Sequence, residues 1–304
     1  MKRSIPELQA ALLAWYDTYG RARLPWRATR DPYRVVVSEF MLQQTQVDRV
    51  AAAYERFVDI FPSFTALATA MRADVVRAWK GLGYNLRAVR LHELAGAVAE
   101  RYGGTLPSDE QALLGLPGIG PYTASAIRAF AFELDDVAID VNVRRVVHRL
   151  RFGIEYPPSA TSSQLDAAAR RLLPQGQAHR WNSALMDLGA TVCRALVPRC
   201  DACPLAAWCL AAQRGPRRIA EAAKQRRTER ARGPQSRLPF EQTRRYLRGR
   251  ILDRLREAPE GVALAAADLV ASGAPAPRYS MDEILGGLER DGLIVRDASG
   301  IKLR

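Results

Sequence analysis

Apolar residues recur every three or four positions along most of this chain, which is the spacing of helices with one buried face. The first such stretch begins at Glu7 and continues on one side through Leu8, Leu12, Trp15 and Tyr19. Before residue 210 no segment alternates convincingly between apolar and polar residues. Because half-buried strands require that alternation, the pattern predicts an all-α body.

The segment from Val35 to Val50 reads VVVSEFMLQQTQVDRV and predicts one continuous helix. In a helix of that register Glu39, Gln43 and Gln46 would share a face, which places a polar stripe on an otherwise apolar element. Three polar residues at this spacing most often form a solvated surface. The pattern alone therefore leaves a solvated face and a functional face both open.

A short glycine turn, Leu116–Gly120, precedes a helix that opens at Pro121. Exposed backbone N–H groups that lead into a helix N-terminus suit a phosphate oxygen, although such a turn is often only a turn. Twenty residues after Gly120, the carboxylate of Asp140 stands among apolar neighbours, where it is costly unless it has a partner or a task. Asp140 is also well placed as a simple helix N-cap.

The last sixty residues have a different pattern. Helices are predicted from Thr243 to Leu255, from Leu264 to Ala271 and from Ser280 to Asp291. Two short apolar strands, 292–296 and 301–303, then flank a turn. Three helices and a hairpin predict a small winged-helix-like α+β module at 243–304, whose partner is either DNA or a protein.

Composition places the chain among globular proteins, since its 304 residues are 48% hydrophobic. The N-terminus leads into no apolar run of signal length, and no span approaches about twenty uninterrupted apolar residues. We therefore expect a cytoplasmic protein, associated with the nucleoid if bacterial, that does not contact a membrane. The three histidines are expected to be packed or solvated rather than catalytic.

The formal net charge is +13, which indicates a polyanionic partner. Nucleic acid is favoured over an anionic membrane because no strongly amphipathic basic helix stands at a terminus. Between Arg214 and Arg250 the chain holds thirteen Lys and Arg residues against three Glu residues. This segment predicts a flexible basic linker at 213–242.

All four cysteines fall within one short segment with the spacing C-x6-C-x2-C-x5-C, at Cys193, Cys200, Cys203 and Cys209. Such clustering in a reducing compartment indicates metal or cluster ligation rather than disulfides. Four thiolates suit either a structural zinc ion or a [4Fe–4S] cluster, and the chemistry alone does not choose between them.

Several of these segments together resemble the endonuclease III and MutY superfamily of DNA glycosylases. The matching segments are LPGIGPYTASAI with AIDVNVRR, SEFMLQQTQV, and LMDLGA followed by the four cysteines. The second of these is similar to the segment that carries the catalytic glutamate in MutY-type adenine glycosylases. The resemblance covers about residues 5–212 and implies a [4Fe–4S] cluster rather than zinc.

The resemblance implies a two-lobed helix-hairpin-helix glycosylase fold over 1–212. A six-helix barrel at about 28–135 would form one lobe, and 1–27 with 136–212 would form the cluster lobe. The implied function is a monofunctional, monomeric glycosylase of base excision repair, which removes adenine mispaired with 8-oxoguanine or guanine from double-stranded DNA. The tail is too short for the Nudix-like domain that many such enzymes carry.

The resemblance also implies roles for single residues. Glu39 would be the general acid, Asp140 would stabilise the sugar cation, and Tyr122 and Asn142 would orient these carboxylates. DNA contacts are implied for Gln43, Gln44, Thr45, Leu82, Tyr84, Gly118, Gly120, Arg194 and Arg199. Tyr84 would enter the base stack opposite the lesion. The base pocket would include Trp26, Arg27, Leu42 and Ser183.

Two residues depart from the family pattern: Val141 stands where the usual motif Asp-Gly-Asn has glycine, a change that leaves Asp140 and Asn142 in place, and Ser183 keeps alternatives open. Ser183 stands where relatives carry a Gln or Glu that reads the adenine edge, so adenine specificity is less secure than the fold. A mismatch thymine or uracil glycosylase therefore remains an alternative. A non-catalytic iron–sulfur DNA-binding regulator is another, although the presence of both Glu39 and Asp140 argues against it.

Overall fold

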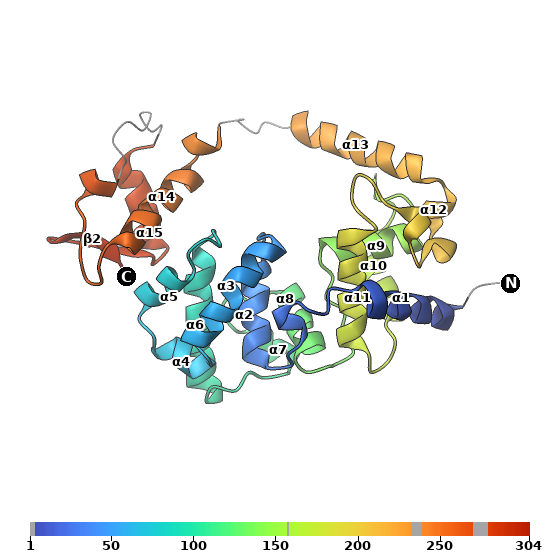
Figure 1. Ribbon diagram of the computed structural model, residues 1–304, viewed down its shortest axis with the longest axis horizontal. Helices are drawn as coiled ribbons and strands as arrows, with labels where there is room; N and C mark the ends of the chain where they lie inside the picture. The colour runs from blue at the N-terminus through green and yellow to red at the C-terminus, as the bar shows by residue number, and fades with distance from the viewer. Residues whose placement is uncertain (1–3, 157, 233–238, 270–278) are drawn as a thin grey trace. The chain divides into compact units, whose positions relative to one another are not determined.

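The structure is a computed structural model that describes residues 4–156, 158–232, 239–269 and 279–304. The chain divides into two compact units, each assembled from separate segments. Unit 1 comprises Met1–Val35, Ser108–Leu114 and Ile119–Gln235. Unit 2 comprises Val36–Pro107, Gly115–Gly118 and Ser236–Arg304. Each unit therefore combines parts of the chain that are distant in sequence (Figure 1).

Unit 1 is helical. Its elements are α1 (Ile5–Tyr19), η1 (Pro25–Arg27), α7 (Glu110–Leu114), α8 (Pro121–Phe130), α9 (Val141–Arg151), α10 (Ser162–Leu172), α11 (Ala178–Thr191), η2 (Cys200–Ala202), η3 (Ala206–Trp208), α12 (Leu210–Gln213) and α13 (Pro216–Arg232). Helix α1 begins with a capping box, in which the Ser4 hydroxyl accepts from the Glu7 backbone and the Glu7 carboxylate accepts from the Ser4 backbone.

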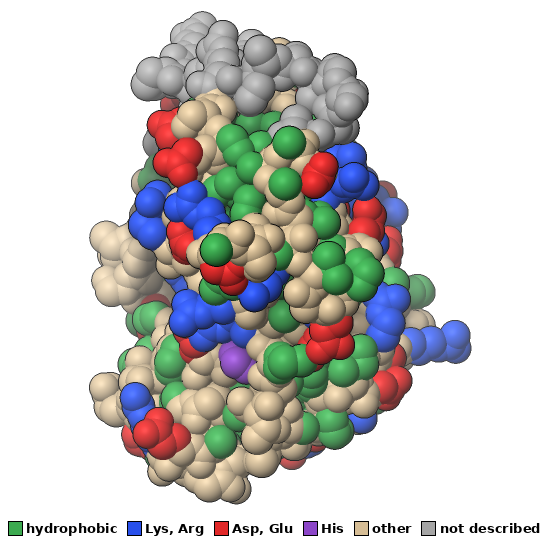
Figure 2. All heavy atoms as spheres, turned by 90° about the vertical axis from the view of Figure 1, so that its left-hand side faces the viewer, with side chains coloured by type: hydrophobic (Ala, Val, Ile, Leu, Met, Phe, Trp, Pro, Cys, Tyr) green, Lys and Arg blue, Asp and Glu red, His purple; other side chains and the backbone are tan. Residues whose placement is uncertain are grey.

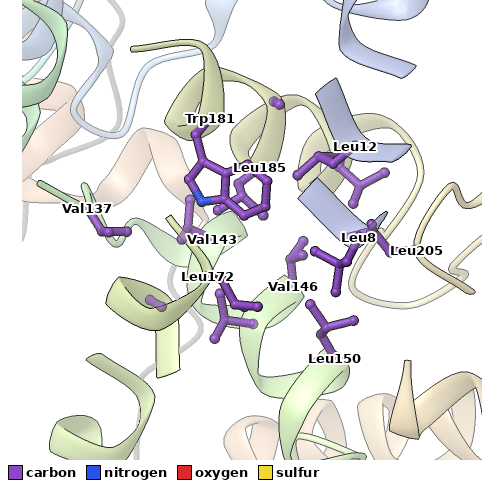
Figure 3. Close-up of a cluster of buried hydrophobic side chains, with 14 of the residues drawn as sticks. Leu8, Leu12, Val137, Val143, Val146, Leu150, Leu172, Trp181, Leu185 and Leu205 are labelled. Atoms are coloured by element: carbon purple, nitrogen blue, oxygen red, sulfur yellow. The ribbon is translucent and has the colours of Figure 1, made fainter. Parts of the chain in front are cut away.

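The core of unit 1 is formed where α1, α9 and α11 meet (Figure 3). Trp181 and Leu185 of α11 pack there with Leu12 of α1 and Val146 of α9, and all four side chains are buried. Burying a side chain of this size contributes about 1.5–3 kcal/mol each. This cluster therefore helps to fix α9, which Asp140 caps, and α11, which leads into the cysteine segment.

Unit 2 begins within α2 (Pro32–Leu42) and contains two groups of elements. The first group is α3 (Val47–Ile60), α4 (Phe64–Thr69), α5 (Arg72–Ala78) and α6 (Leu86–Tyr102). The second, the C-terminal module, is η4 (Phe240–Gln242), α14 (Arg244–Glu257), η5 (Ala266–Leu269), α15 (Met281–Arg290), β1 (Ile294–Asp297) and β2 (Gly300–Leu303).

The C-terminal module shares one apolar core with α5 and α6. Val76 of α5 and Val89 of α6 pack in the same buried cluster as Leu252, Leu255 and Leu288 of the module. Strands β1 and β2 pair antiparallel, with Ile294 opposite Leu303 and Arg296 opposite Ile301. Leu264 adds an isolated bridge to Ile301.

The all-α body with a small two-stranded sheet near the C-terminus is confirmed. The continuous helix predicted over Val35 to Val50 is wrong, because α2 ends at Leu42 and α3 starts at Val47. Gln44 has a φ of 56°, a left-handed conformation that ends a helix, so Glu39, Gln43 and Gln46 do not share one helical face.

Two predictions in the C-terminal third also differ from the structure. The segment predicted as a flexible basic linker contains the regular helix α13, which is anchored by the buried side chain of Ile219. The helix predicted from Leu264 to Ala271 is a short 3-10 turn at Ala266–Leu269, and its last two positions lie outside the described residues. Within the described ranges, the helices are all too short or too polar to cross a bilayer.

Candidate active site

Asp140 lies at the N-terminus of α9 with its carboxylate fixed by backbone and side-chain donors. Oδ1 accepts from the backbone N–H groups of Asn142, at 2.9 Å, and Val143, at 2.7 Å. Oδ2 accepts from Asn142 Nδ2 at 2.8 Å. Asp140 is thus an N-cap, and its half-buried carboxylate is held in one orientation at the positive end of the helix dipole.

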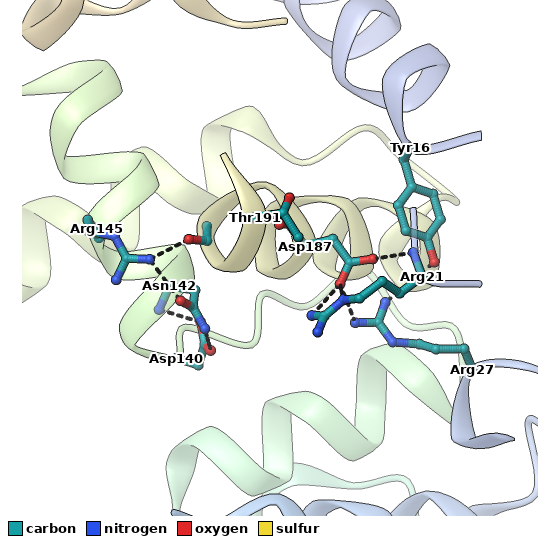
Figure 4. A network of polar contacts seen from close by, with 9 residues as sticks. Tyr16, Arg21, Arg27, Asp140, Asn142, Arg145, Asp187 and Thr191 are labelled. Carbon is teal, nitrogen blue, oxygen red and sulfur yellow. Dashed lines mark hydrogen bonds and ion pairs between the residues drawn. The ribbon is translucent and has the colours of Figure 1, made fainter. Parts of the chain in front are cut away.

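Arg145 connects this carboxylate to the far end of α11 (Figure 4). Its Nη2 atom donates to Asn142 Oδ1 at 2.8 Å and to the Gly189 carbonyl at 2.6 Å. Its Nε atom donates to the Cys193 carbonyl at 2.7 Å. One guanidinium group therefore ties the partner of Asp140 to the start of the cysteine segment.

Asp187, also on α11, holds the loop that carries the predicted base-pocket residues (Figure 4). Its side chain is fully buried and receives the Arg21 backbone N–H at 2.7 Å and the Arg21 guanidinium at 2.7 and 2.9 Å. Arg27 approaches the same carboxylate at 3.4 Å, and the neighbouring Trp26 is buried. The ion pairs fix η1 against α11.

A polar stripe runs along α11 at four-residue spacing, through His179, Ser183 and Asp187. The Ser183 hydroxyl is buried and has no hydrogen-bond partner among the described residues, and neither do the two ring nitrogens of His179. Burial, followed by the nearby guanidinium groups of Arg30 and Arg27, lowers the pKa of His179 to about 4. At neutral pH this imidazole is uncharged.

The glycine turn has the geometry that its sequence predicts. Gly118 has a φ of 78°, and a Cβ atom there would come within 3.0 Å of the Phe40 ring. Gly120 is the N-cap of α8, and Pro121 occupies the first turn. Tyr122, in the same turn, is half-buried and packs against a cluster that includes Phe130.

Glu39 lies in unit 2 on α2, and only 7% of the residue is exposed. Its helix neighbours Val37, Phe40 and Met41 are buried in the core, so the backbone at Glu39 is held by apolar packing on both sides. Leu42, the last residue of the helix, is half-buried. A carboxyl group this deeply buried is uncommon unless it is paired or functional.

Arg87, which the sequence did not single out, organises the predicted DNA-contact loops of unit 2. Its buried guanidinium donates to the carbonyls of Phe40, Met41 and Gln43 at 2.6–2.8 Å. It also donates to the carbonyls of Leu82 and Gly83 and to the Thr45 hydroxyl. Desolvation is the main cause that lowers the pKa of Arg87, to about 10. The group still carries its charge at neutral pH.

These bonds bring two segments of the chain into contact, Gln43–Thr45 and Leu82–Gly83. Tyr84 follows directly, with a φ of 45° and 38% of the residue exposed. The sequence-predicted DNA contacts Gln43, Gln44, Thr45, Leu82 and Tyr84 therefore line one surface of unit 2.

The cysteine segment is arranged around a second buried arginine, Arg149. Its Nη1 atom lies 3.5 Å from Cys193 Sγ and 2.8 Å from the Arg194 carbonyl, and Nη2 donates to the Ala195 carbonyl at 2.9 Å. Glu155 pairs with the same guanidinium. The backbone after Cys193 is thus held by bonds to α9.

All four cysteines line one small pocket with apolar walls that include Val192, Ala206 and Ile219. Burial raises the pKa of the Cys203 thiol to about 12, and it also raises the pKa values of Cys200 and Cys209. In the described parts of the chain, no three His, Cys, Asp or Glu side chains have the arrangement expected for a single metal ion. Arg194 and Arg199, in the same segment, are exposed.

Comparison with known proteins identifies the family. Residues 37–175 match the model of the HhH-GPD superfamily of base excision DNA repair proteins. An adenine DNA glycosylase of Mycolicibacterium smegmatis is 41% identical over 290 residues, which are 95% of this chain and 93% of that protein. The chain belongs to the adenine DNA glycosylase family.

Two further proteins show how much of the chain is similar to known enzymes. The human adenine DNA glycosylase is 41% identical over 226 residues, which cover 70% of this chain and 41% of that protein. A solved thermostable thymine-DNA glycosylase is 31% identical, with a TM-score of 0.64, over 69% of this chain and 97% of that one. The adenine DNA glycosylase fold is thus shared with an enzyme named for another base.

Within each unit the structure gathers many of the predicted residues. In unit 1, Asn142 donates to Asp140, and Arg27 is linked to α11, the helix that carries Ser183. The residues that sequence reasoning missed are the buried partners, namely Arg87, Arg145, Arg149 and Asp187. Arg145 and Arg149 had one visible signal, since both lie in the basic helix that follows Asp140.

Proposed function

We propose that this chain hydrolyses the N-glycosidic bond of an adenine mispaired with 8-oxoguanine or guanine, as a monofunctional enzyme of base excision repair. The observation that carries the proposal is the 41% identity over 95% of the chain with an adenine DNA glycosylase. The fixed carboxylate of Asp140 and the buried carboxyl of Glu39 add support, because cleavage of a glycosidic bond uses two carboxyl groups in different environments.

Departure of the base requires a proton. In the proposed reaction the carboxylic acid of Glu39 donates its proton to a ring nitrogen of adenine. The bond between C1′ and N9 then breaks, and its electron pair leaves with the neutral base. The carboxylate of Glu39 next accepts a proton from the water molecule that attacks C1′, which returns the acid to its starting state. The products are free adenine and an abasic site.

The sugar becomes positively charged as the base leaves. In the proposal the ionised carboxylate of Asp140 lies against this developing oxocarbenium ion and stabilises it electrostatically. The three hydrogen bonds to Asp140 hold the charge in place before the reaction, so little reorganisation is needed. Asn142 and Tyr122 are proposed as positioning residues for the two carboxyl groups.

Tyr122 also bears on the products. Bifunctional relatives in the resembled superfamily use a lysine at this position as the nucleophile that leads to strand cleavage. A lysine amine leads to strand cleavage by forming an imine with the sugar, and a tyrosine hydroxyl does not form an imine. We therefore propose that the enzyme leaves the abasic strand intact. The proposed physiological state is a cytoplasmic monomer that acts on double-stranded DNA.

DNA contacts in the proposal come from both units. The surface with Gln43, Gln44, Thr45, Leu82 and Tyr84 would face the base opposite the extruded adenine, and the amides near Gly118 and Gly120 would bind phosphate. The base pocket would include Trp26, Arg27, Leu42 and Ser183. Arg194 and Arg199 are exposed, as phosphate contacts need to be.

The four cysteines are proposed to hold a [4Fe–4S] cluster. Their side chains line one pocket, the walls of this pocket are apolar, and the Arg149 guanidinium lies close enough to donate to Cys193 sulfur. This donor set fits a thiolate-ligated cluster, since hydrogen bonds to ligand sulfur stabilise its negative charge. When bound, the cluster would supply rigidity to the segment that carries Arg194 and Arg199.

A panel of duplexes, each with one mispair, tests the proposed function. Adenine paired with 8-oxoguanine or guanine should be released under single-turnover conditions, and strand breaks should appear only after alkali. Adenine in a normal pair with thymine should remain. The alternative function, a mismatch thymine or uracil glycosylase, is favoured by Ser183 and by the similarity to a thymine-DNA glycosylase. Release of thymine or uracil from pairs with guanine, with adenine untouched, would overturn the proposal.

A further inference from the structure

The C-terminal module contacts the residue that is predicted to enter the base stack. The guanidinium of Arg245, on α14, lies 4.0 Å from the centre of the Tyr84 ring. Arg245 Nη1 also donates to the Tyr84 hydroxyl at 2.8 Å. A cation stacked on an aromatic ring and bonded to its hydroxyl constrains that ring, so the module and the Tyr84 loop act as one surface.

A second contact holds α14 in this place. The side chain of Arg256 is 4% exposed, donates to Asn85 Oδ1 at 2.7 Å and donates to the Val76 carbonyl at 3.0 Å. Asn85 follows Tyr84 directly in the chain. Together with the apolar core that joins the module to α5 and α6, these bonds fix α14 beside the predicted DNA-contact loops.

Between α14 and these loops lies a groove of about 940 Å³. Its walls come from the segment of Gln43 to Arg49, the segment of Gly81 to Arg87, and α14. Arg49, Arg245 and Arg250 line it, are exposed, and form no ion pair with any acidic residue that the structure describes. Figure 2 shows Lys and Arg side chains in several groups on a face of the molecule.

We propose that this groove binds the phosphate backbone of DNA, and that α14 makes the C-terminal module a DNA-binding element of the enzyme. The inference deepens the proposed function and rests on it, because the ligand is the DNA that carries the mispair. Three guanidinium groups around one groove repel one another, and a polyanion removes that repulsion while it releases its own counterions.

The arrangement also excludes a simple apolar docking site. Among the described residues that line the groove there are several arginines and two carboxylates, Asp253 and Asp291, which pair with Arg256 and Arg248. The guanidinium groups of Arg49, Arg245 and Arg250, which form no ion pair with a described carboxylate, are exposed, so an anion can reach them. The charge and the contact with Tyr84 both favour DNA over an acidic protein as the occupant.

The test uses the full-length enzyme and two double variants of equal charge change. Arg245→Glu with Arg250→Glu reverses two groove arginines. Arg254→Glu with Arg290→Glu reverses two exposed arginines of the same module outside the groove. The probe is a fluorescein-labelled 20-base-pair duplex without a mispair, and its dissociation constant is measured by anisotropy at several salt concentrations.

The groove pair should weaken binding by at least about tenfold at about 50 mM salt. The logarithm of the association constant falls as the logarithm of the salt concentration rises, and the groove pair should make this slope shallower by about 2. The outer pair should change the affinity by less than about threefold. Equal weakening by both pairs would overturn the proposal, because it would indicate only a general field effect. An unchanged affinity in the groove pair would also overturn it and would favour a protein occupant.

Two further measurements separate this inference from folding and from the proposed function. If thermal unfolding shows that the groove pair is not folded, the milder double variant Arg245→Ala with Arg250→Ala replaces it. This variant should also bind the same duplex more weakly than the wild type does. An unchanged affinity in this variant would contradict the proposal. Adenine release from a mispair is measured separately at saturating enzyme. Absence of release by the unmodified enzyme would refute the proposed function, while anisotropy would still decide whether the groove binds DNA.

Discussion

A Cβ atom added to Gly189 would lie 2.6 Å from the Cβ atom of Asn142, so α9 and α11 approach at a distance that only glycine permits. Asn142 is the residue that donates to Asp140, and the Gly189 carbonyl accepts from Arg145. The close approach of the two helices therefore sets the orientation of the Asp140 carboxylate.

Gly189→Ala should disturb this approach. The neighbours of the new methyl group include backbone atoms of Asn142, which move only with their helix, so we expect a destabilisation of about 1–3 kcal/mol. Adenine release should fall as well, because Asn142 shifts. Gly96→Ala is the matched control, since its Cβ would meet no atom within 4 Å in the helix α6. That variant should unfold at the same temperature or slightly higher, and equal losses in both variants would contradict the steric explanation.

Arg87→Lys should weaken the loops that carry the predicted DNA contacts. An ammonium group has one nitrogen, so it does not reach both Gln43–Thr45 and Leu82–Gly83, and buried carbonyls lose their donors. We expect a loss of about 2–4 kcal/mol in the free energy of unfolding, measured with urea. Arg90→Lys, at an exposed position on the same helix, should change this value by less than about 0.5 kcal/mol. An equally small change for Arg87→Lys would show that the hydrogen bonds of Arg87 to the two loops do not stabilise the protein.

His179 gives a pH dependence of stability with a defined sign. Burial lowers its pKa to about 4 in the folded protein, against an ordinary value of 6.5 for histidine. Between these values the unfolded chain binds a proton that the folded chain does not, so stability falls as the pH falls from 6.5 toward 4. From pH 7.5 to pH 5 the contribution is about 2 kcal/mol. Urea unfolding of the wild type and of His179→Leu should differ in pH dependence by that amount. Identical pH profiles would rule out the buried neutral imidazole as the cause.

Cys203→Ser should remove the proposed cluster. The wild type should contain about four iron atoms per chain and a broad visible absorbance, because four thiolates hold a [4Fe–4S] cluster. The variant should lose most of both and should unfold at a lower temperature. Arg194→Ala leaves the thiols in place and should retain the iron while it weakens DNA binding. Zinc in the wild type, in place of iron, would contradict the cluster assignment.

The helical elements were predictable because their signals are local. Apolar periodicity is contained within each helix, and the turn at Gly118, the N-cap at Gly120 and Pro121 lie within a few consecutive residues. The same holds for the hairpin of the C-terminal module. Roles for Glu39 and Asp140 came instead from the resemblance of their segments to a known family.

The errors and omissions share a different cause, which is contact between distant parts of the chain. Helix α2 ends early where its last carbonyls receive hydrogen bonds from Arg87, more than forty residues later. Asp187 is paired with Arg21 across 166 positions. The stack of Arg245 on Tyr84 spans 161 positions. The residues next to one partner in the sequence give no indication of the other partner, so such pairs cannot be predicted from local patterns.

The single-turnover rate of adenine release by Glu39→Gln and Asp140→Asn tests the proposed chemistry most directly. The substrate is a duplex with adenine opposite 8-oxoguanine, and saturating enzyme removes any effect of affinity on the rate. The control is Glu55→Gln, which removes an exposed carboxyl group from the adjacent helix α3. Each active-site variant should release adenine at least about 100-fold more slowly than the wild type, while its dissociation constant stays within about threefold and the control is unchanged. A rate near that of the wild type in either variant would contradict the assignment of these two carboxyl groups to catalysis.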